Sequence, residues 1–71
     1  MQSDIRLRTV LVVHRDNQYL VGRDIFGNLR WSNSVYDAKR KRNPNKALLW
    51  AIKTGGGLML FNPVVGQTKM I

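Results

Sequence analysis

The sequence predicts a small α+β domain, in which a three-stranded antiparallel meander is followed by a helix and a final strand. Three observations lead to this fold class: short apolar and β-branched runs in the first half, turn residues between them, and one helical segment bounded by a proline and a glycine triplet. At 71 residues the chain is near the lower size for one hydrophobic core. We therefore expect residues 1–71 to form a single domain.

The meander is expected from turn chemistry between the apolar runs. Asp16 and Asn17 tolerate left-handed backbone and form a first turn, and Gly27 with Asn28 forms a second. Gly22 indicates a bulge, because glycine inside a strand often marks an irregular pairing. The three strands are expected over residues 5–15, 19–26 and 29–32.

A helical turn is expected to follow the meander. Ser34 and Asp37 have the spacing of a capping box, in which short side chains satisfy open amides of the first turn. That turn should run toward Arg42 and break near Pro44, because proline lacks an amide proton and disfavours helix in the preceding residue. The helix is thus predicted to be interrupted.

The better-formed helix is expected over Pro44 to Thr54. Asn43 is its predicted cap and Pro44 its first residue, while glycines 55–57 end it by accepting positive φ. A buried strand is expected over residues 58–61, before the next proline. The tail over 64–71 fits both an edge strand and a loose end, and its place in the fold stays open.

Charge is the most informative property of the composition. The formal net charge is +8, and from residue 38 onward the sequence has seven Lys and Arg and no acid. A positive half without acids attracts a polyanion or an acidic protein surface. The alternative is that these cations only keep a small domain soluble.

Several functional classes are excluded or disfavoured. The sequence has no Cys, which removes disulfides, thiolate metal sites and a Cys nucleophile, and suggests a reducing cytoplasm. The apolar runs are far shorter than a membrane span, so we expect no membrane partner. A lone His14 near Asp16 is too little for a catalytic or metal site. We therefore expect no enzyme and no cofactor.

The glycines do not indicate a phosphate loop. Such loops place glycines before a helix, so that free amides point at the anion. Here the glycines follow the helix, and helix termination is the simpler interpretation.

A basic run is the strongest functional signal, since clustered cations bind phosphates through counterion release. A helical wheel puts Ala47, Leu48, Ala51 and Ile52 on one arc and Trp50 with two lysines on the other. On that arrangement the tryptophan stacks on a base or anchors an interface. The other interpretation is that Trp50 folds back over the edge of the sheet. The candidate binding residues are Lys39, Arg40, Lys41, Arg42, Lys46, Trp50 and Lys53, with Arg6, Arg8 and Arg30 as an extension across the sheet.

The layout resembles two known groups. Trp31, the alanines 38, 47 and 51, and the segment TGGGLMLFNP at 54–63 are similar to short phage- and prophage-encoded α+β proteins. The meander is also similar to the arm-binding domain of integrases and to plant AP2 domains, whose sheet reads the DNA major groove. That resemblance implies DNA contacts by Arg6, Arg8, Arg23, Arg30 and Trp31, but the final strand and the proline break depart from it.

These patterns favour a non-catalytic, nucleic-acid-binding module in the cytoplasm. The alternative is a phage-encoded inhibitor of a host defence system, similar in role to an anti-CRISPR, whose cationic face binds a protein partner. A third hypothesis is a homodimer that pairs through Leu49 and Trp50.

Overall fold

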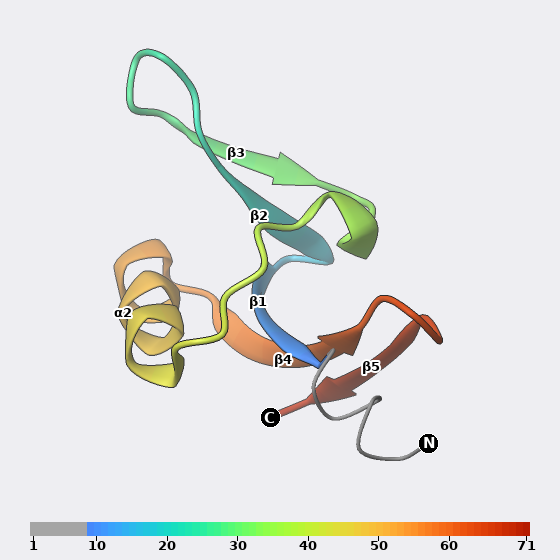
Figure 1. Ribbon diagram of the computed structural model, residues 1–71. Helices are drawn as coiled ribbons and strands as arrows, with labels where there is room; N and C mark the ends of the chain where they lie inside the picture. The colour runs from blue at the N-terminus through green and yellow to red at the C-terminus, as the bar shows by residue number, and fades with distance from the viewer. Residues whose placement is uncertain (1–8) are drawn as a thin grey trace.

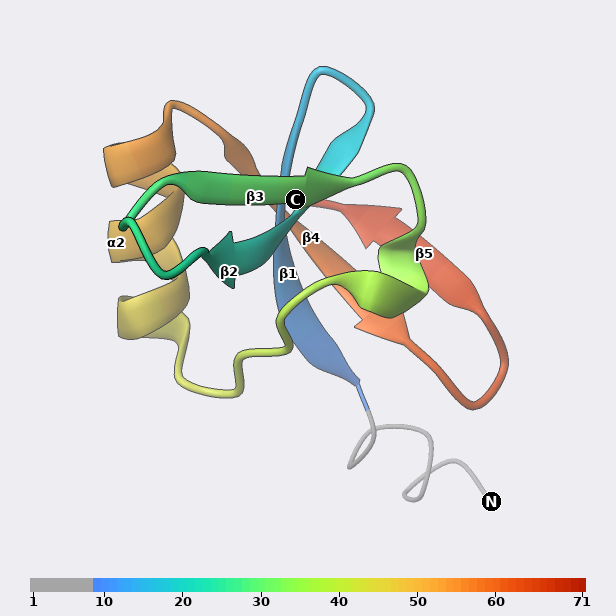
Figure 2. The same cartoon turned by 90° about the horizontal axis from the view of Figure 1, so that it is seen from above.

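A five-stranded antiparallel sheet forms the frame of the molecule, with its strands in the order β3-β2-β1-β4-β5. The structure is a computed structural model that describes residues 9–71. The domain is α+β, as expected, and the meander is its first three strands (Figures 1 and 2). The strands are β1 (Val10–Arg15), β2 (Gln18–Arg23), β3 (Leu29–Ser32), β4 (Gly57–Asn62) and β5 (Gln67–Met70); the helical elements are the 3-10 turn η1 (Val35–Asp37) and the α-helix α2 (Pro44–Thr54).

The β1–β2 turn has the predicted chemistry. Asp16 and Asn17 take positive φ values of 51° and 64°, a conformation that Asp and Asn tolerate better than most residues. The pairing of β2 with β3 is irregular between Leu20 and Gly22. The bulge predicted at Gly22 is therefore confirmed.

The second strand is shorter than predicted, because it ends at Arg23 and not at residue 26. The Asp24 carboxylate accepts hydrogen bonds from the amides of Phe26 and Asn28, at 2.8 and 2.9 Å. These bonds begin the turn before Gly27. Ile25 and Phe26, read from sequence as strand residues, lie at the exposed tip of this β2–β3 turn.

The first predicted helical turn does not run to Arg42. Ser34 caps it as expected, by accepting from the Tyr36 amide, but the helical part is only η1. The second half of the capping box is altered, since Asp37 accepts from the Ser32 hydroxyl at 2.7 Å. At Ala38 the chain is extended, with φ −65° and ψ 143°. The backbone of Lys39 and Lys41 then forms hydrogen bonds with β2 and β1.

Helix α2 has the predicted bounds and caps. The Asn43 side chain accepts from the amides of Asn45 and Lys46, and Pro44 is the first helical residue. Gly55 ends the helix in the left-handed conformation, at φ 69°. Asn43 and Gly55 thus fix both ends of the helix that carries Trp50.

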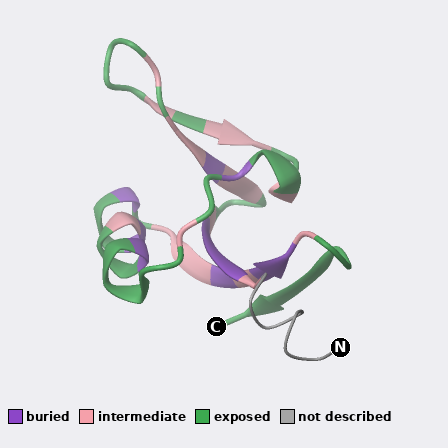
Figure 3. Cartoon of the chain, viewed as in Figure 1, coloured by how far each residue is buried: buried purple, intermediate pink, exposed green. Residues whose placement is uncertain are grey.

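The buried side of α2 differs from the predicted arc. Ala47, Ala51 and Thr54 are buried, whereas Leu48 and Ile52 are more than half exposed (Figure 3). Small residues let the helix approach β1 and β4 closely, and the larger aliphatic side chains point outward. The interpretation in which Trp50 folds back over the sheet is the one that the structure supports.

The core has two parts, formed by alternate residues of β1, and we name the two sides of the sheet after the elements that cover them. On the α2 face, the buried residues Val13, Leu20 and Ala51 pack with Trp31 and Trp50. On the η1 face, a second cluster packs with Val35 and Tyr19; its buried members are Val10, Val12, Ala38, Met59 and Phe61. Both clusters share the same strands, because successive side chains of a strand point to opposite faces.

The last strands lie beyond β1. β4 covers the predicted strand over 58–61 and pairs along β1, while the segment that follows Pro63 turns and returns as β5. Of the two options for the tail, the structure has the edge strand over Gln67–Met70. All four residues of β5 are exposed.

Candidate nucleic-acid interface

The basic run lies in a strand-like segment between β1 and β2. β1 and β2 pair directly only near their shared turn, at His14 with Tyr19 and Arg15 with Gln18. Farther along, the amide of Lys41 donates to the carbonyl of Leu11 at 2.9 Å, and the carbonyl of Lys41 accepts from the amide of Leu11 at 2.8 Å. We call residues 38–42 the bridging segment.

A further backbone bond ties the bridging segment to β2. The amide of Lys39 donates to the carbonyl of Leu20, at 2.9 Å. The segment therefore fills the gap where β1 and β2 separate, as the yellow-green chain in Figure 2 shows. Three of its backbone groups, the amide of Lys39 and the amide and carbonyl of Lys41, bond to the sheet, and these bonds hold the basic side chains in place.

Strand-like geometry divides the basic run between the two faces. Ala38 is buried in the cluster on the η1 face, and the Arg40 guanidinium lies 5.9 Å from the Phe61 ring on that face. Lys41 points the other way, with its ammonium 4.8 Å from the Trp50 ring centroid. Alternation places Lys39 with Lys41 and Arg42 with Arg40.

Trp50 is the centre of the cations on the α2 face. Its ring packs on the cluster of Val13, Leu20 and Ala51 and remains partly exposed. The Arg23 guanidinium is 5.3 Å from the ring centroid, and Lys41 is the second cation near the same ring. Each contact is a cation–π interaction of about 0.5–1 kcal/mol at an exposed site.

Lys41 lies in an unfavourable electrostatic environment. Its partial burial lowers the pKa of its ammonium below the ordinary value of 10.5, and the nearby charges of Lys39 and Lys46 lower that pKa further. We call Arg23, Lys39, Lys41 and Lys46 the Trp50 cluster. Lys53 lies two turns after Lys46 on the same arc of α2.

No acid neutralises this cluster within the described part of the chain. Among residues 9–71 the ion pair within 4.0 Å joins Arg15 to Asp16, and it lies at the β1–β2 turn. The cations are therefore held close together on a rigid support with their charge open to an anion. A bound anion would relieve the repulsion that lowers the pKa of Lys41.

The remaining candidate residues are more scattered. Arg30 is exposed on the edge strand β3, and its neighbour Trp31 points to the opposite face, into the core beneath α2. The structure thus does not bring Arg30 into the Trp50 cluster. Arg6 and Arg8 lie outside the described residues.

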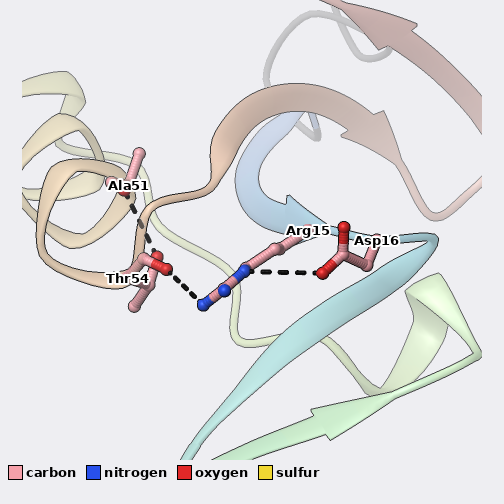
Figure 4. Close-up of polar contacts among 4 residues, drawn as sticks. All are labelled: Arg15, Asp16, Ala51 and Thr54. Atoms are coloured by element: carbon pink, nitrogen blue, oxygen red, sulfur yellow. Dashed lines mark hydrogen bonds and ion pairs between the residues drawn. The ribbon is translucent and has the colours of Figure 1, made fainter.

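Arg15 joins the end of β1 to the end of α2. Its guanidinium donates to the carbonyl of Thr54 at 2.9 Å and lies 3.6 Å from Asp16 (Figure 4). The Thr54 hydroxyl in turn donates to carbonyls of the last helical turn, those of Trp50 and Ala51. Arg15 thus supports the helix C-terminus, where a cation is favourable.

Among residues 9–71, the side chains that could ligate a metal do not gather in one place. In the part of the chain from Thr9 to Ile71, His, Cys, Asp and Glu side chains form no group of three able to hold a metal. His14 lies in β1 beside Gly57. No helix among the described residues is long and apolar enough to cross a bilayer.

Sequence reasoning did not place Arg23 with Trp50. It named Arg23 only through the integrase resemblance, as a residue of the sheet. The contact depends on the β2–β3 hairpin reaching over α2, which no local pattern encodes. A strand over residues 38–42 would have sent alternate basic side chains to opposite faces of the sheet. The capping residues Ser34 and Asp37 favoured a helix there instead.

In comparisons with known proteins, no family model, curated protein or solved structure matches this chain.

Proposed function

We propose that the protein binds nucleic acid through phosphate contacts of the Trp50 cluster. One observation carries the proposal: Lys41 is held beside Lys39 and Lys46, with a lowered pKa, and no acid among residues 9–71 pairs with them. Phosphates neutralise such a cluster and release counterions. The seven cations and missing acids after residue 38 add a long-range attraction.

Trp50 acts in this proposal as a support for cations. Its ring is packed against the core on one side and lies close to Arg23 and Lys41. Little of the ring is then open to a base, in contrast to the stacking role considered from sequence. Contacts to phosphate carry no sequence information directly. We therefore expect binding with weak sequence preference.

A second cationic strip lies on the η1 face. Arg40 and Arg42 line a shallow depression of about 230 Å³ together with Val10, Pro63 and Val64. Its arginines point away from the Trp50 cluster, so they contact a different phosphate or strand.

A fluorescence titration tests the proposal. The variant Trp31→Phe leaves Trp50 as the single tryptophan, and short single- and double-stranded oligonucleotides are added at low and moderate salt. If about five phosphates are neutralised, affinity for duplex falls by roughly a few hundredfold over a fourfold rise in salt. In the same background, Lys41→Gln should reduce the slope of log affinity against log salt by about 0.9.

Lys69→Gln is the matched control for charge. Lys69 is on β5, which lies on the opposite side of the molecule from α2 in Figures 1 and 2, so its loss should leave the slope nearly unchanged. Absence of binding at low salt refutes the proposal. If Lys41→Gln and Lys69→Gln change the salt slope equally, binding depends on net charge and not on the Trp50 cluster.

The alternative function is a non-catalytic inhibitor that binds an acidic protein surface, such as that of a host defence system. It has the same dependence on charge, so charge reversal does not separate the two. Binding to oligonucleotides with the expected salt slope favours nucleic acid, while capture of a defined acidic protein without oligonucleotide affinity favours the inhibitor. Both alternatives are proposed for a cytoplasmic, non-enzymatic protein.

The homodimer hypothesis named Leu49 and Trp50 as the contact surface, and the structure leaves mainly Leu49 for this contact. Trp50 is half-buried within its own chain, whereas Leu49 is exposed on α2. A dimer through Leu49 would also bring the lysines of two α2 helices together. Sedimentation at several protein concentrations, with Leu49→Ala as the comparison, tests this hypothesis.

A further inference from the structure

The tip of the β2–β3 hairpin presents two large apolar side chains to solvent. Ile25 is 92% exposed and Phe26 is 80% exposed. Both stand in a turn that Asp24 holds from within, through its bonds to the amides of Phe26 and Asn28. The tip is thus a well-formed turn that carries apolar residues outward.

A second apolar surface lies on α2. The helix packs through its small residues, and this leaves Leu48, Leu49 and Ile52 on the outer side, with Ile52 68% exposed. Isolated exposed aliphatic residues are ordinary, but three on one turn-and-a-half of a short helix form a patch. Figure 3 shows that the outer side of α2 is exposed and its inner side buried.

The two apolar surfaces are on the same side of the molecule. In Figure 1 the hairpin tip and α2 both lie at the left, and in Figure 2 the tip lies over α2. Arg23 fixes this arrangement, because its guanidinium donates to the Gly27 carbonyl at 2.7 Å and lies over the Trp50 ring. The tip and the outer side of α2 therefore lie toward the same side of the molecule, with the tip projecting above the helix in Figure 1.

Cations accompany the apolar residues. Arg23 lies below the tip, and Lys46 and Lys53 lie on α2 beside Leu49 on the helical wheel. Asp24 is the single acidic residue of β2, β3, α2 and the turn between the two strands. Its carboxylate is engaged by backbone amides. A partner that fits this side of the protein therefore has an apolar interior and a negatively charged surface.

The shape of this side favours a lipid surface over a peptide. The residues at 25 and 26 stand on a projecting tip. Two depressions of the described structure, of about 430 and 230 Å³, are lined by other residues, which lie in or next to β1, β4, β5 and the bridging segment. A peptide that binds as an amphipathic helix needs a groove to bury its apolar side chains. A bilayer accepts projecting side chains and provides anionic headgroups for nearby cations.

We propose that the β2–β3 tip and the outer face of α2 dock the protein on anionic lipid membranes, with Ile25 and Phe26 inserted at the interface. The sequence predicted no membrane partner because its apolar runs are too short for a helix that spans the bilayer. That argument does not apply to docking on the membrane surface. Docking on a surface requires only exposed apolar side chains beside cations. The proposal does not depend on nucleic-acid binding.

Cosedimentation with lipid vesicles tests this docking. The full chain is mixed with vesicles of phosphatidylcholine alone and with vesicles that also contain phosphatidylserine, at low and physiological ionic strength. We expect binding to the anionic vesicles and weak binding to the neutral ones. The double variant Ile25→Ser/Phe26→Ser should reduce partitioning at least about tenfold, since it removes most of the inserted apolar area.

The control is Val65→Ser. Val65 is also exposed and in a turn between strands, but it lies between β4 and β5 and away from the cationic strip of Arg40 and Arg42. Its loss should leave vesicle binding unchanged. Ile52→Ser tests the α2 half without altering the tip and should also weaken binding. Equal melting temperatures of the variants establish that they fold.

Three results would overturn the docking proposal. They are no binding of the wild-type chain to anionic vesicles, equal vesicle binding of the Ile25/Phe26 variant and the wild type, or loss in the valine control as large as in that variant. The same variants are titrated with oligonucleotide. If the tip variant loses oligonucleotide affinity and keeps vesicle binding, the tip belongs to the nucleic-acid surface, and the lipid proposal fails while the first proposal stands.

Discussion

The ammonium of Lys41 lies 4.8 Å from the centroid of the Trp50 ring, and the backbone of the same lysine is bonded at both its amide and its carbonyl to Leu11. Lys41 thus joins the sheet to the helix, and the pKa of its ammonium is lowered by burial and by the charges of Lys39 and Lys46. This double role makes it the most useful residue for testing the candidate site.

The titration of Lys41 should reveal the repulsion in the cluster. Burial, followed by the charges of Lys39 and Lys46, lowers its pKa from 10.5. The unfolded chain then binds more protons than the folded one between the lowered pKa and 10.5, so this group makes stability rise with pH across that window. NMR of the Lys41 ε-methylene should give a midpoint below that of a short peptide containing the residue.

Addition of a phosphate-rich oligonucleotide should raise the pKa of Lys41, because an anion favours its charged form. A midpoint equal to that of the peptide would contradict the electrostatic description of the site. A lowered midpoint that does not respond to oligonucleotide would leave that description intact and count against the proposed ligand.

Trp50 should contribute to stability as well as to binding. It packs on Val13, Leu20 and Ala51, and Trp50→Leu removes part of that packing and both cation–π contacts. We expect a loss of about 1–3 kcal/mol in the free energy of unfolding, less than for a fully buried tryptophan. Leu49→Ala, on the exposed side of α2, should change it by about 0.5 kcal/mol or less. Urea unfolding measures both.

Acid should loosen the β2–β3 turn. The amide of Asn28, and then that of Phe26, bond to the Asp24 carboxylate and lower its pKa below 3.8. A lowered folded-state pKa means that the stabilisation is fully present above 3.8 and is lost as pH falls through the folded value. The amide resonances of Phe26 and Asn28 should shift together in that range.

The β4–β5 turn offers an internal control for this acid effect. There the Val64 amide bonds to the side-chain oxygen of Asn62, at 3.0 Å, and an amide side chain does not titrate. The Val64 resonance should stay constant while those of Phe26 and Asn28 move. Parallel movement of all three would indicate global unfolding and refute a local switch at Asp24.

Gly56 should tolerate no side chain. A Cβ at this position would lie 2.6 Å from the carbonyl oxygen of His14, which is backbone and cannot move aside. We expect Gly56→Ala to cost about 1–3 kcal/mol. At Gly57 the nearest atom is Nε2 of the His14 side chain, at 2.9 Å, and rotation of the imidazole relieves the clash. Thermal unfolding should thus give a smaller loss for Gly57→Ala than for Gly56→Ala.

Local sequence determined the elements whose signals are short-range. The turn at Asp16 and Asn17, the irregularity at Gly22, and the bounds of α2 were predictable because backbone φ and the first unsatisfied amides depend on adjacent residues. The net positive charge and the missing acids of the second half were also plain from composition.

The tertiary structure decided where the charges point. The basic run follows capping residues, so a helix was the reasonable expectation, but bonds to Leu11 and Leu20 draw it into the sheet. Those bonds join residues far apart in the chain, and a strand turns alternate side chains to opposite faces. This sends Arg40 to Phe61 and Lys41 to Trp50. The composition predicted a cationic protein, and long-range pairing alone set which cations share a surface.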